Sequence, residues 1–362
     1  MTKSPLLFTP GPLSTTDSVK SAMLRDVGSR DAAFLETVRS IRRRLLLLCG
    51  PNAEGYEAIL MQGSGTFAIE SVLSCLPAGA RLLILINGAY GRRMLQIAQT
   101  HRMEVIPCEI PEREKFRAAD VGREGARSKP SHVALVHCET TTGLINPVEE
   151  IGAVVRERGC TFIVDAMSSF GGIPLDVGGA GIGFLISSAN KCLQGVPGFA
   201  FVIAARAALE QCRGSARTVA LDLYAQWRGL EENGEFRFTP PTHALLAFEQ
   251  ALVELDAEGG IAARAARYGA NQRALVEGMR RLGFETYLPP EDQSAMITTF
   301  RYPRIPGFSF PKFYAALAGR GFLIYPGKLT HEDCFRIGTI GRLTVEDVRA
   351  LLAAIEAVAG IE

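Results

Sequence analysis

Short apolar runs alternate with stretches of helical periodicity from about residue 57 to residue 205. Between these runs, segments such as FAIESVLSCL, GRRMLQIAQTH and PVEEIGAVVRERG place apolar residues at the 3.6-residue spacing of amphipathic helices. The expected strands are YEAILMQ, RLLILIN, MEVIPCE, HVALVHC, CTFIVDA, GFLISS and GFAFVIA. This alternation is typical of a mainly parallel sheet with helices on both faces. We therefore predict an α/β fold whose large domain holds a mainly parallel seven-stranded sheet sandwiched by helices.

The pattern changes after about residue 242, where two long alanine-rich helical segments follow one another, HALLAFEQALVELDAEGG and IAARAARYGANQRALVEGMRRLG. Strand-like runs, AMITTFRY and FLIYPG, come next, and VEDVRALLAAIEAVAG is the last helical segment. The chain of 362 residues is long enough for two such units. We predict a large domain over residues 17–245 and a smaller α+β domain over residues 246–362.

Charge and composition exclude several classes of function. Lysine and arginine (39) nearly balance aspartate and glutamate (38), whereas nucleic-acid binding requires a basic excess or a dense basic stripe. The cluster Arg42-Arg43-Arg44 precedes LLLL and is interpreted as one face of a helix. No apolar run approaches the roughly 18 to 20 residues of a membrane span, and the start of the chain lacks a secretory apolar region. We therefore expect a cytoplasmic protein without nucleic-acid or membrane partners.

Cysteine and histidine do not form a recognisable metal site. The eight cysteines are scattered without a C-x-x-C pair, and the five histidines are equally dispersed. No metal is expected. The cysteines are interpreted mostly as small buried apolar residues in a reducing compartment.

Ligands of parallel sheets gather at the carboxyl ends of the strands. The first such end is GSGT (63–66), between the strand YEAILMQ and a helix. Backbone N–H groups at a helix N-terminus, together with the hydroxyls of Ser64 and Thr66, can hold a phosphate. The alternative is a helix cap with a tight turn. Because the segment is neither a dinucleotide fingerprint nor a Walker loop, a single phosphate fits better than a nucleotide.

Two charged residues follow later strand ends. Asp165 closes the strand CTFIVDA and could cap a helix or bind a cation. Lys191 follows GFLISS; a lysine is usually solvated, but in a desolvated pocket its pKa falls and its amine becomes nucleophilic. A phosphate site, a carboxylate for a pyridinium nitrogen and an amine for a Schiff base are what pyridoxal 5'-phosphate requires.

Two further residues fit a ligand of this kind. Tyr90, in LINGAYGRR, could stack on a planar ring, or it could be a half-buried aromatic at a helix start. Arg336, in CFRIGTIG, lies between apolar residues, where a guanidinium requires an anion. That anion could be an internal carboxylate, or the carboxylate or phosphonate of a substrate.

Taken together, these residues resemble a known family. The chain is similar nearly throughout to the 2-aminoethylphosphonate:pyruvate aminotransferases, which are class V, fold type I enzymes that use pyridoxal phosphate. The segments that carry the resemblance are LLFTPGPLSTT, MQGSGTFAIESVLS, NGAYGRR, HCETTTGLINPVEEIG, FIVDAMSSFGG, SSANKCLQGVPGFAFVIA, FRFTPPTHAL and YPGKLTHEDCFRIGTIG.

The resemblance implies a role for each matching residue. Lys191 and Asp165 would be catalytic, Lys191 attaching the cofactor and Asp165 pairing with its pyridine nitrogen. Arg336 would bind the substrate anion, and the N-terminal segment 1–16, with Gly11 in its TPGP turn, would lie over the active site. The other cofactor-binding residues would be Ser64, Gly65, Thr66, Tyr90, Thr140, Asn190 and, from the neighbouring subunit of a homodimer, Thr239.

Several alternatives to this function stay open. Alanine:glyoxylate and serine:pyruvate aminotransferases resemble the chain on most of the same scaffold, and RDVGSRDAAF and GKLTHEDCFRIG favour the phosphonate branch. A cysteine desulfurase-like lyase would need a mobile nucleophilic cysteine, for which Cys334 is the late candidate. A binding protein without catalysis would not need Lys191, Asp165 and Arg336 together.

Overall fold

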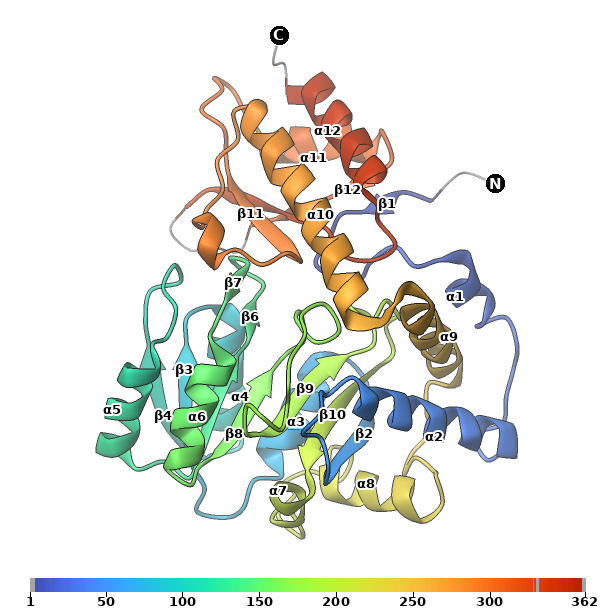
Figure 1. Cartoon of the computed structure of the whole chain (residues 1–362), viewed down its shortest axis with the longest axis vertical. Helices are drawn as coiled ribbons and strands as arrows, with labels where there is room; N and C mark the ends of the chain where they lie inside the picture. Colours follow the sequence, from blue (N-terminus) through green and yellow to red (C-terminus); the bar gives the residue numbers. More distant parts are fainter. Residues whose placement is uncertain (1–3, 328, 330–331, 360–362) are drawn as a thin grey trace.

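The computed structural model describes residues 4–327, 329 and 332–359. A large unit with a central sheet forms the lower part of the molecule in Figure 1, and a smaller unit with its own sheet and helices lies above it. Three residues of the segment GKLTHEDCFRIG (Lys328, Thr330 and His331), and both ends of the chain (1–3 and 360–362), lie outside the described residues.

The seven expected strands of the large unit are confirmed. Their order across the sheet is β2-β10-β9-β8-β5-β3-β4, and β10 runs antiparallel to both of its neighbours while the other adjacent pairs are parallel. The prediction of a mainly parallel sheet is therefore also confirmed. The strands are β2 (Tyr56–Gln62), β3 (Arg81–Ile86), β4 (Glu104–Glu109), β5 (His132–Val136), β8 (Thr161–Asp165), β9 (Ile182–Ser188) and β10 (Phe199–Ala205).

Burial explains the composition of these strands. The inner strands β5, β8, β9 and β10 are almost entirely buried, because helices cover both faces of the sheet, and their sequences are nearly continuous apolar runs. The edge strand β4 is partly exposed and contains Pro107, which pairs with Ile84 on one side only. A proline has no N–H to donate and is tolerated at such an edge.

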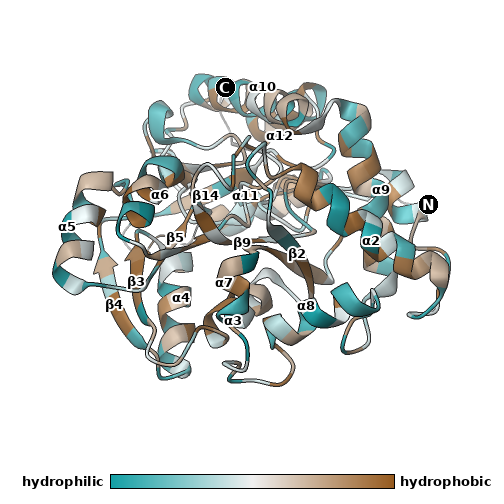
Figure 2. Ribbon diagram, turned by 60° about the horizontal axis from the view of Figure 1, so that its bottom comes forward, coloured by the Kyte–Doolittle hydropathy of each residue, from teal (hydrophilic) through white to brown (hydrophobic). Residues whose placement is uncertain are grey.

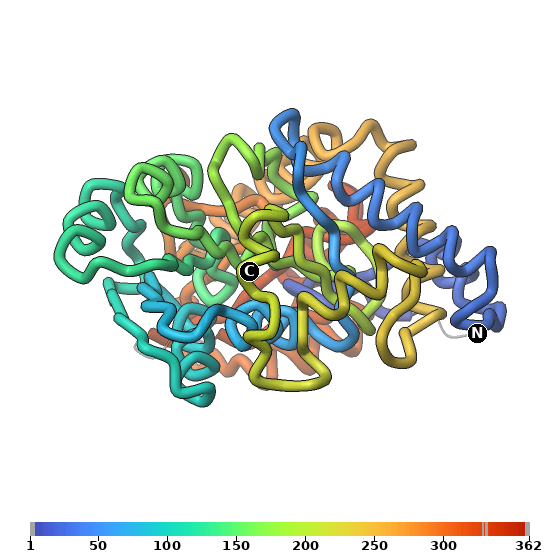
Figure 3. The backbone as a smooth tube through the Cα atoms, turned by 90° about the horizontal axis from the view of Figure 1, so that it is seen from below, coloured from blue at the N-terminus to red at the C-terminus, as the bar shows by residue number. Residues whose placement is uncertain are grey.

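Helices form a layer on each face of the sheet (Figure 2). One layer contains α3 (Gly65–Ser74) and α4 (Ala89–Thr100), and the other contains α2 (Ala32–Leu47), α5 (Ala118–Ser128), α6 (Val148–Glu157) and α9 (Thr242–Glu258). The arginine cluster 42–44 lies on α2, as expected. In Figure 3, α2 and α9 run side by side although they are far apart in sequence, and Thr37 Oγ1 donates to Glu249 Oε2 at 3.0 Å between them.

Shorter elements complete the large unit. Within the described residues, no helix has the length and apolar content that a membrane span requires. The short elements are α1 (Asp17–Ser21), β6 (Cys138–Glu139), β7 (Leu144–Ile145), α7 (Arg206–Glu210) and α8 (Leu223–Glu232).

The smaller unit has a separate apolar core. Its three-stranded antiparallel sheet has the order β11-β14-β13, and Phe300 and Phe335 stack across β11 and β14 with ring centroids 5.8 Å apart. β1 (Leu6–Leu7) pairs in parallel with β12 (Phe322–Leu323), so the N-terminal strand is bound to this unit. The other elements are α10 (Gly260–Arg281), β11 (Ile297–Arg301), α11 (Phe310–Ala318), β13 (Tyr325–Pro326), β14 (Cys334–Gly338) and α12 (Val345–Ala359), with the 3-10 turn η1 (Pro290–Asp292).

The two cores suggest where to divide the chain. The division expected between residues 245 and 246 falls inside α9, and Leu252 and Leu255 of that helix belong to the core of the large unit. Leu275 and Met279, on the following helix, belong to the core of the smaller unit. We therefore propose to divide the domains between α9 and α10, at Gly259.

Alanine substitutions at two helical glycines test how tightly α6 packs. A Cβ at Gly152 in α6 would lie 2.0 Å from the Ala180 carbonyl oxygen, whereas one at Gly269 in α10 would meet only the flexible end of Arg273. We expect Gly152→Ala to lower the free energy of unfolding by about 1–3 kcal/mol. Gly269→Ala should raise it by up to about 1 kcal/mol through helix propensity. Urea unfolding of both variants measures this, and equal stabilisation by the two would contradict the packing.

Candidate active site

A cavity lies at the carboxyl ends of the parallel strands. Its volume is about 630 Å³, part of which is open to solvent. It brings together residues that follow β2, β3, β5, β8 and β9, as expected for a sheet of this kind. The predicted site residues that line it are Ser64, Gly65, Thr66, Tyr90, Thr140, Asp165, Asn190 and Lys191.

Asp165, the last residue of β8, places a buried carboxylate in this cavity. Its Oδ1 accepts a hydrogen bond from the backbone N–H of Met167 at 2.9 Å. Among the described residues, its buried Oδ2 has no hydrogen-bond partner. Burial raises the pKa of Asp165 to about 6, against the opposing effects of the Met167 hydrogen bond and of the positive charges of Lys191 and Arg93. A buried carboxylate oxygen normally accepts a hydrogen bond from the protein, from water or from a ligand.

Lys191 follows β9, and its amine is enclosed by the N-terminal segment. Nζ donates to the carbonyl oxygen of Pro10 at 2.6 Å. Gly11 has φ +115°, and a Cβ there would lie 2.8 Å from Lys191 Cδ, so only glycine fits this turn. Burial lowers the pKa of Lys191, although the surrounding Tyr90, Cys192 and Asp165 favour the charged form. An amine with a lowered pKa is a better nucleophile at neutral pH.

The segment GSGT begins α3. Ser64 is the N-cap residue, yet its side chain makes no capping hydrogen bond, which argues against the plain helix-cap interpretation. A Cβ at Gly65 would lie 2.4 Å from the sulfur of Met167, so this turn packs closely against the flexible side chain of the loop after β8. The N–H groups of the first turn and the hydroxyls of Ser64 and Thr66 can hold an anion.

Arg93 lines the same cavity and was missed in the sequence analysis. Its Nη1 donates to Thr66 Oγ1 at 3.3 Å, and its guanidinium carbon lies 5.0 Å from the centroid of the Tyr90 ring. It adds a positive charge beside the neutral donors of the GSGT segment. Residues three apart face each other on a helix, so the spacing of Tyr90 and Arg93 in α4 was the available signal.

Glu139 is a second missed residue. Its Oε2 accepts from the backbone N–H of Tyr90 at 3.2 Å, and its Oε1 accepts from the hydroxyl of Thr141 at 2.6 Å. Burial raises the pKa of Glu139 to about 7, although these hydrogen bonds favour the carboxylate. Glu139 thereby ties the start of α4 to the loop that carries Thr140. No local pattern in the sequence indicates this contact.

Arg336 comes from β14 in the smaller unit and reaches the loop that carries Thr140. It is 2% exposed; Nη1 donates to the Thr140 carbonyl oxygen at 2.9 Å and Nε to the Pro326 carbonyl oxygen at 3.0 Å. Burial lowers the pKa of this guanidinium. No ion pair joins Arg336 to a carboxylate in the part of the chain that the structure describes, so the internal carboxylate considered above is not observed there.

Two other residues lie away from this cavity. Thr239 lines a separate surface cavity with Ser29 and Arg30. Cys334 is buried at the start of β14, and a Cβ at Gly327 would lie 2.3 Å from its sulfur. A buried strand position does not provide the mobile cysteine that a desulfurase-like lyase requires.

Comparisons with known proteins agree with this architecture. Residues 16–320 match the aminotransferase class-V family. A 2-aminoethylphosphonate--pyruvate transaminase of Syntrophobacter fumaroxidans is 53% identical over 353 residues, covering 96% of this chain and 95% of the relative. One of Aeromonas hydrophila is 53% identical over 355 residues, covering 96% and 93%. The crystal structure of an alanine--glyoxylate aminotransferase from Nostoc sp. superposes with a TM-score of 0.91 at 27% identity, covering 99% of this chain and 96% of that one.

The buried carboxylate of Asp165 predicts a pH-dependent stability. Its folded pKa of about 6 exceeds the ordinary value of 3.8, so the folded state keeps a proton that the unfolded state has lost. The resulting stability is present below about pH 4 and is lost as the pH rises to about 6. We expect Asp165→Asn to gain stability relative to the parent protein across this range, by roughly 3 kcal/mol.

Urea unfolding of the cofactor-free proteins between pH 4 and pH 7 measures this difference. Asp176→Asn is a matched control. Hydrogen bonds from Gly179 and Asn52 lower the pKa of half-buried Asp176, so its titration affects stability only below about pH 4 and the difference between this variant and the parent should stay nearly constant above that pH. A difference between Asp165→Asn and the parent that does not change with pH would contradict the assigned burial.

Proposed function

Since the chain belongs to the aminotransferase class-V family, we propose that it is a transaminase that moves the amino group of 2-aminoethylphosphonate to pyruvate. The products are phosphonoacetaldehyde and L-alanine, so the carbon that loses the amine is oxidised to an aldehyde and the keto carbon of pyruvate is reduced. The fold is the fold type I architecture of this family. The choice of substrate is supported by relatives of that name at 53% identity over nearly the whole chain.

We propose pyridoxal 5'-phosphate as the cofactor, and the residues of the cavity fit it. The unpaired Oδ2 of Asp165 requires a donor, which a protonated pyridine nitrogen would supply. The start of α3 offers donors for a phosphate, and Arg93 beside Thr66 adds positive charge. When bound, this cofactor supplies an aldehyde that reacts with amines and a ring that accepts electrons.

Each side chain of the cavity then has a role. Ser64, Gly65, Thr66 and Asn190 would hold the phosphate. Tyr90 would stack on the ring and Thr140 would lie near the ring hydroxyl, and both are held in place through Glu139 and its neighbours. These assignments follow the resemblance of the motifs and the shared cavity.

Lys191 and Asp165 would carry the chemistry. Lys191 would attach the cofactor and, once released by the incoming amine, take a proton from the carbon that bears the nitrogen. Burial suits it for this because a neutral amine is needed to accept the proton. The carboxylate of Asp165 would keep the ring nitrogen protonated. The observation that carries the proposal is the convergence of the buried amine and the unpaired buried carboxylate on one cavity.

Arg336 would bind the anionic end of both substrates. A planar guanidinium can hold a phosphonate or a carboxylate through paired hydrogen bonds, so one residue serves both half-reactions. Its contacts among the described residues are two backbone carbonyl groups and the ring of Tyr325, and none of them is a carboxylate ion pair, so an anionic substrate could pair with its charge. Gly11 would contact the substrate from the N-terminal segment that lies over Lys191.

A homodimer would complete the site. Under this proposal Thr239 of one subunit reaches the phosphate of the other. The Phe238–Thr239 segment lies beside the end of β2, since Gln62 Nε2 donates to the Phe238 carbonyl oxygen at 3.0 Å. Phe67 and Phe238 are 51% and 46% exposed, and exposed aromatic side chains are typical of protein interfaces.

We also propose that the enzyme works in the cytoplasm. All eight cysteines are free thiols rather than disulfides, which suits a reducing compartment.

The role of Lys191 has a direct test. The purified protein incubated with pyridoxal 5'-phosphate should turn yellow, and borohydride reduction should fix the cofactor on the peptide that contains Lys191. Mass spectrometry of the digested protein locates the adduct. Lys191→Ala should show no adduct at this position. An adduct on another lysine of the parent protein would refute the assignment.

A donor screen tests the reaction. We expect 2-aminoethylphosphonate with pyruvate to give the highest kcat/KM among 2-aminoethylphosphonate, alanine and serine tested against pyruvate and glyoxylate. Arg336→Ala should lower kcat/KM in both half-reactions by roughly tenfold to a hundredfold, with the cofactor still bound, because a charge-assisted hydrogen bond is lost. Arg342→Ala, at an exposed arginine nearby, is the matched control. Highest activity with alanine and glyoxylate would favour the alternative branch.

A further inference from the structure

The turn that carries Lys191 has an unfavourable backbone conformation. Gly195 N donates to the Ala189 carbonyl oxygen and Gln194 N to the Lys191 carbonyl oxygen, each at 2.8 Å. These two bonds close a compact backbone turn over residues 189–195, which carries Lys191. Gln194 has φ +63°, in the left-handed region. A residue with a side chain costs roughly 1–2 kcal/mol there relative to the right-handed region. Contacts from elsewhere in the protein must therefore hold this turn.

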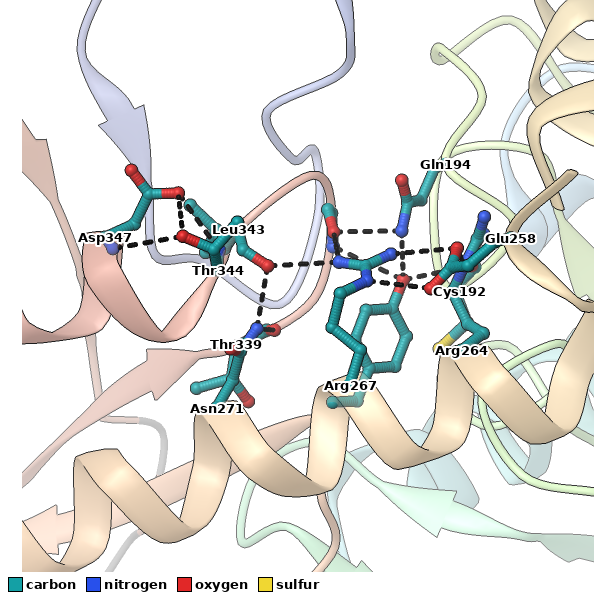
Figure 4. A network of polar contacts seen from close by, with 12 residues as sticks. Cys192, Gln194, Glu258, Arg264, Arg267, Asn271, Thr339, Leu343, Thr344 and Asp347 are labelled. Atoms are coloured by element: carbon teal, nitrogen blue, oxygen red, sulfur yellow. Dashed lines mark hydrogen bonds and ion pairs between the residues drawn. The ribbon is translucent and has the colours of Figure 1, made fainter.

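The side chain of Gln194 supplies two of these contacts. Its Nε2 donates to the hydroxyl of Tyr268 at 2.7 Å and to the carbonyl oxygen of Gly341 at 2.9 Å (Figure 4). Gln194 is buried, so neither bond competes with water. Tyr268 lies on α10, and Gly341 lies in the loop that follows β14. The turn is thus bound to the smaller unit at two points.

The peptide next to Lys191 is held by the same helix. The carbonyl oxygen of Cys192 accepts from Arg264 Nη1 at 2.9 Å and from the hydroxyl of Tyr268 at 3.0 Å. Because a peptide group is planar, two donors on one carbonyl fix the orientation of the chain immediately after the lysine. Tyr268 donates here and accepts from Gln194, so its hydroxyl joins both ends of the turn.

The two arginines of this network share one carboxylate. Arg264 is 1% exposed, and its Nε lies 2.6 Å from Glu258 Oε2, while Arg267 Nε lies 2.8 Å from Glu258 Oε1. Arg267 Nη1 also donates to the carbonyl oxygens of Gly341 and Leu343, at 2.7 and 3.0 Å. A buried ionic network of this kind adds little stability compared with apolar packing, so stability alone does not account for it.

We propose that Tyr268, supported by Arg264 and Gln194, is a positioning residue for Lys191. The network connects the Lys191 turn to α10 and to the loop after β14, the strand that carries Arg336 (Figure 4). It thereby holds the amine and the anion-binding guanidinium in a defined relation, although they belong to different units of the fold. This inference rests on the proposed function, in which both groups act on one substrate.

Tyr268→Phe tests the proposal in the holoenzyme. It keeps the buried ring but removes the hydrogen bonds to Cys192 and Gln194. Because misplacement of a catalytic group reduces turnover strongly, we expect kcat to fall by about tenfold to a hundredfold, with KM for both substrates changed less than about threefold. Tyr56→Phe is the matched control, since the Tyr56 hydroxyl also donates to a backbone carbonyl, of Ile182 at 2.7 Å, but at the opposite end of β9 from the Lys191 turn.

A second measurement needs no cofactor. In the cofactor-free protein, the rate at which Lys191 is methylated by formaldehyde and cyanoborohydride, followed by mass spectrometry over a pH series, reports the state of its amine. We expect Tyr268→Phe to shift the midpoint of this profile and Tyr56→Phe to leave it unchanged. This readout stands even if the parent protein binds no pyridoxal phosphate, which would refute the proposed function but not the positioning.

Gln194→Gly provides a variant that should fold in any case, because glycine adopts φ +63° without strain. The substitution removes both side-chain hydrogen bonds of Gln194. We expect the same fall in kcat and the same shift in methylation as for Tyr268→Phe, with little loss of thermal stability. Unchanged kcat and an unchanged methylation profile in either variant would overturn the proposal. So would a fall in kcat that Tyr56→Phe reproduces at equal loss of stability.

Discussion

The rest of this structure depends on one constraint: ionisable side chains near the carboxyl ends of the strands are buried away from water. The ionisable side chains at this edge are those of Asp165, Glu139, Lys191 and Arg336. Burial raises the pKa of the two carboxyl groups and lowers the pKa of the amine and of the guanidinium, so it favours the neutral form of each group. Such groups are costly in a protein interior unless a partner compensates them. Here the fold supplies part of that compensation and leaves one carboxylate oxygen of Asp165 without a partner. A ligand with a matching donor and anion would complete it.

The N-terminal segment closes this edge from above. Its carbonyl groups at Phe8 and Ser14 accept hydrogen bonds from Gly338 and Arg342, so it is bound to the smaller unit on both sides of the turn that touches Lys191. A Cβ at Gly338 would lie 2.3 Å from the Thr9 carbonyl oxygen. The segment therefore lies close to both the strand of Arg336 and the amine.

Under the proposed function, the smaller unit would be part of the site. β14 supplies Arg336, and α10 supplies the hydroxyl and the guanidinium that hold the chain after Lys191. The large unit supplies Asp165, Tyr90 and the start of α3. The two apolar cores are separate. A small apolar cluster around Cys192 and Tyr268, together with polar networks, joins the two units where the chemistry is proposed. The hydrogen bonds between the two units fix their relative direction and distance, because hydrogen bonds are directional and apolar contacts are not.

The sequence by itself determined the strands of the sheet and the residues at their ends. An apolar run bounded by small polar residues is a local pattern, and parallel strands end at the same edge of a sheet, so Ser64, Asp165 and Lys191 could be predicted to meet. Only the tertiary structure decided the order of the strands, the reversed direction of β10, and the contacts of Arg93, Glu139, Gln194 and Tyr268. Those features depend on which distant segments pack together. Apart from the spacing of Tyr90 and Arg93, the side chains involved carry no local signal that distinguishes them from ordinary helix or turn residues. The division near Gly259 depends in the same way on which core each face of α9 and α10 joins.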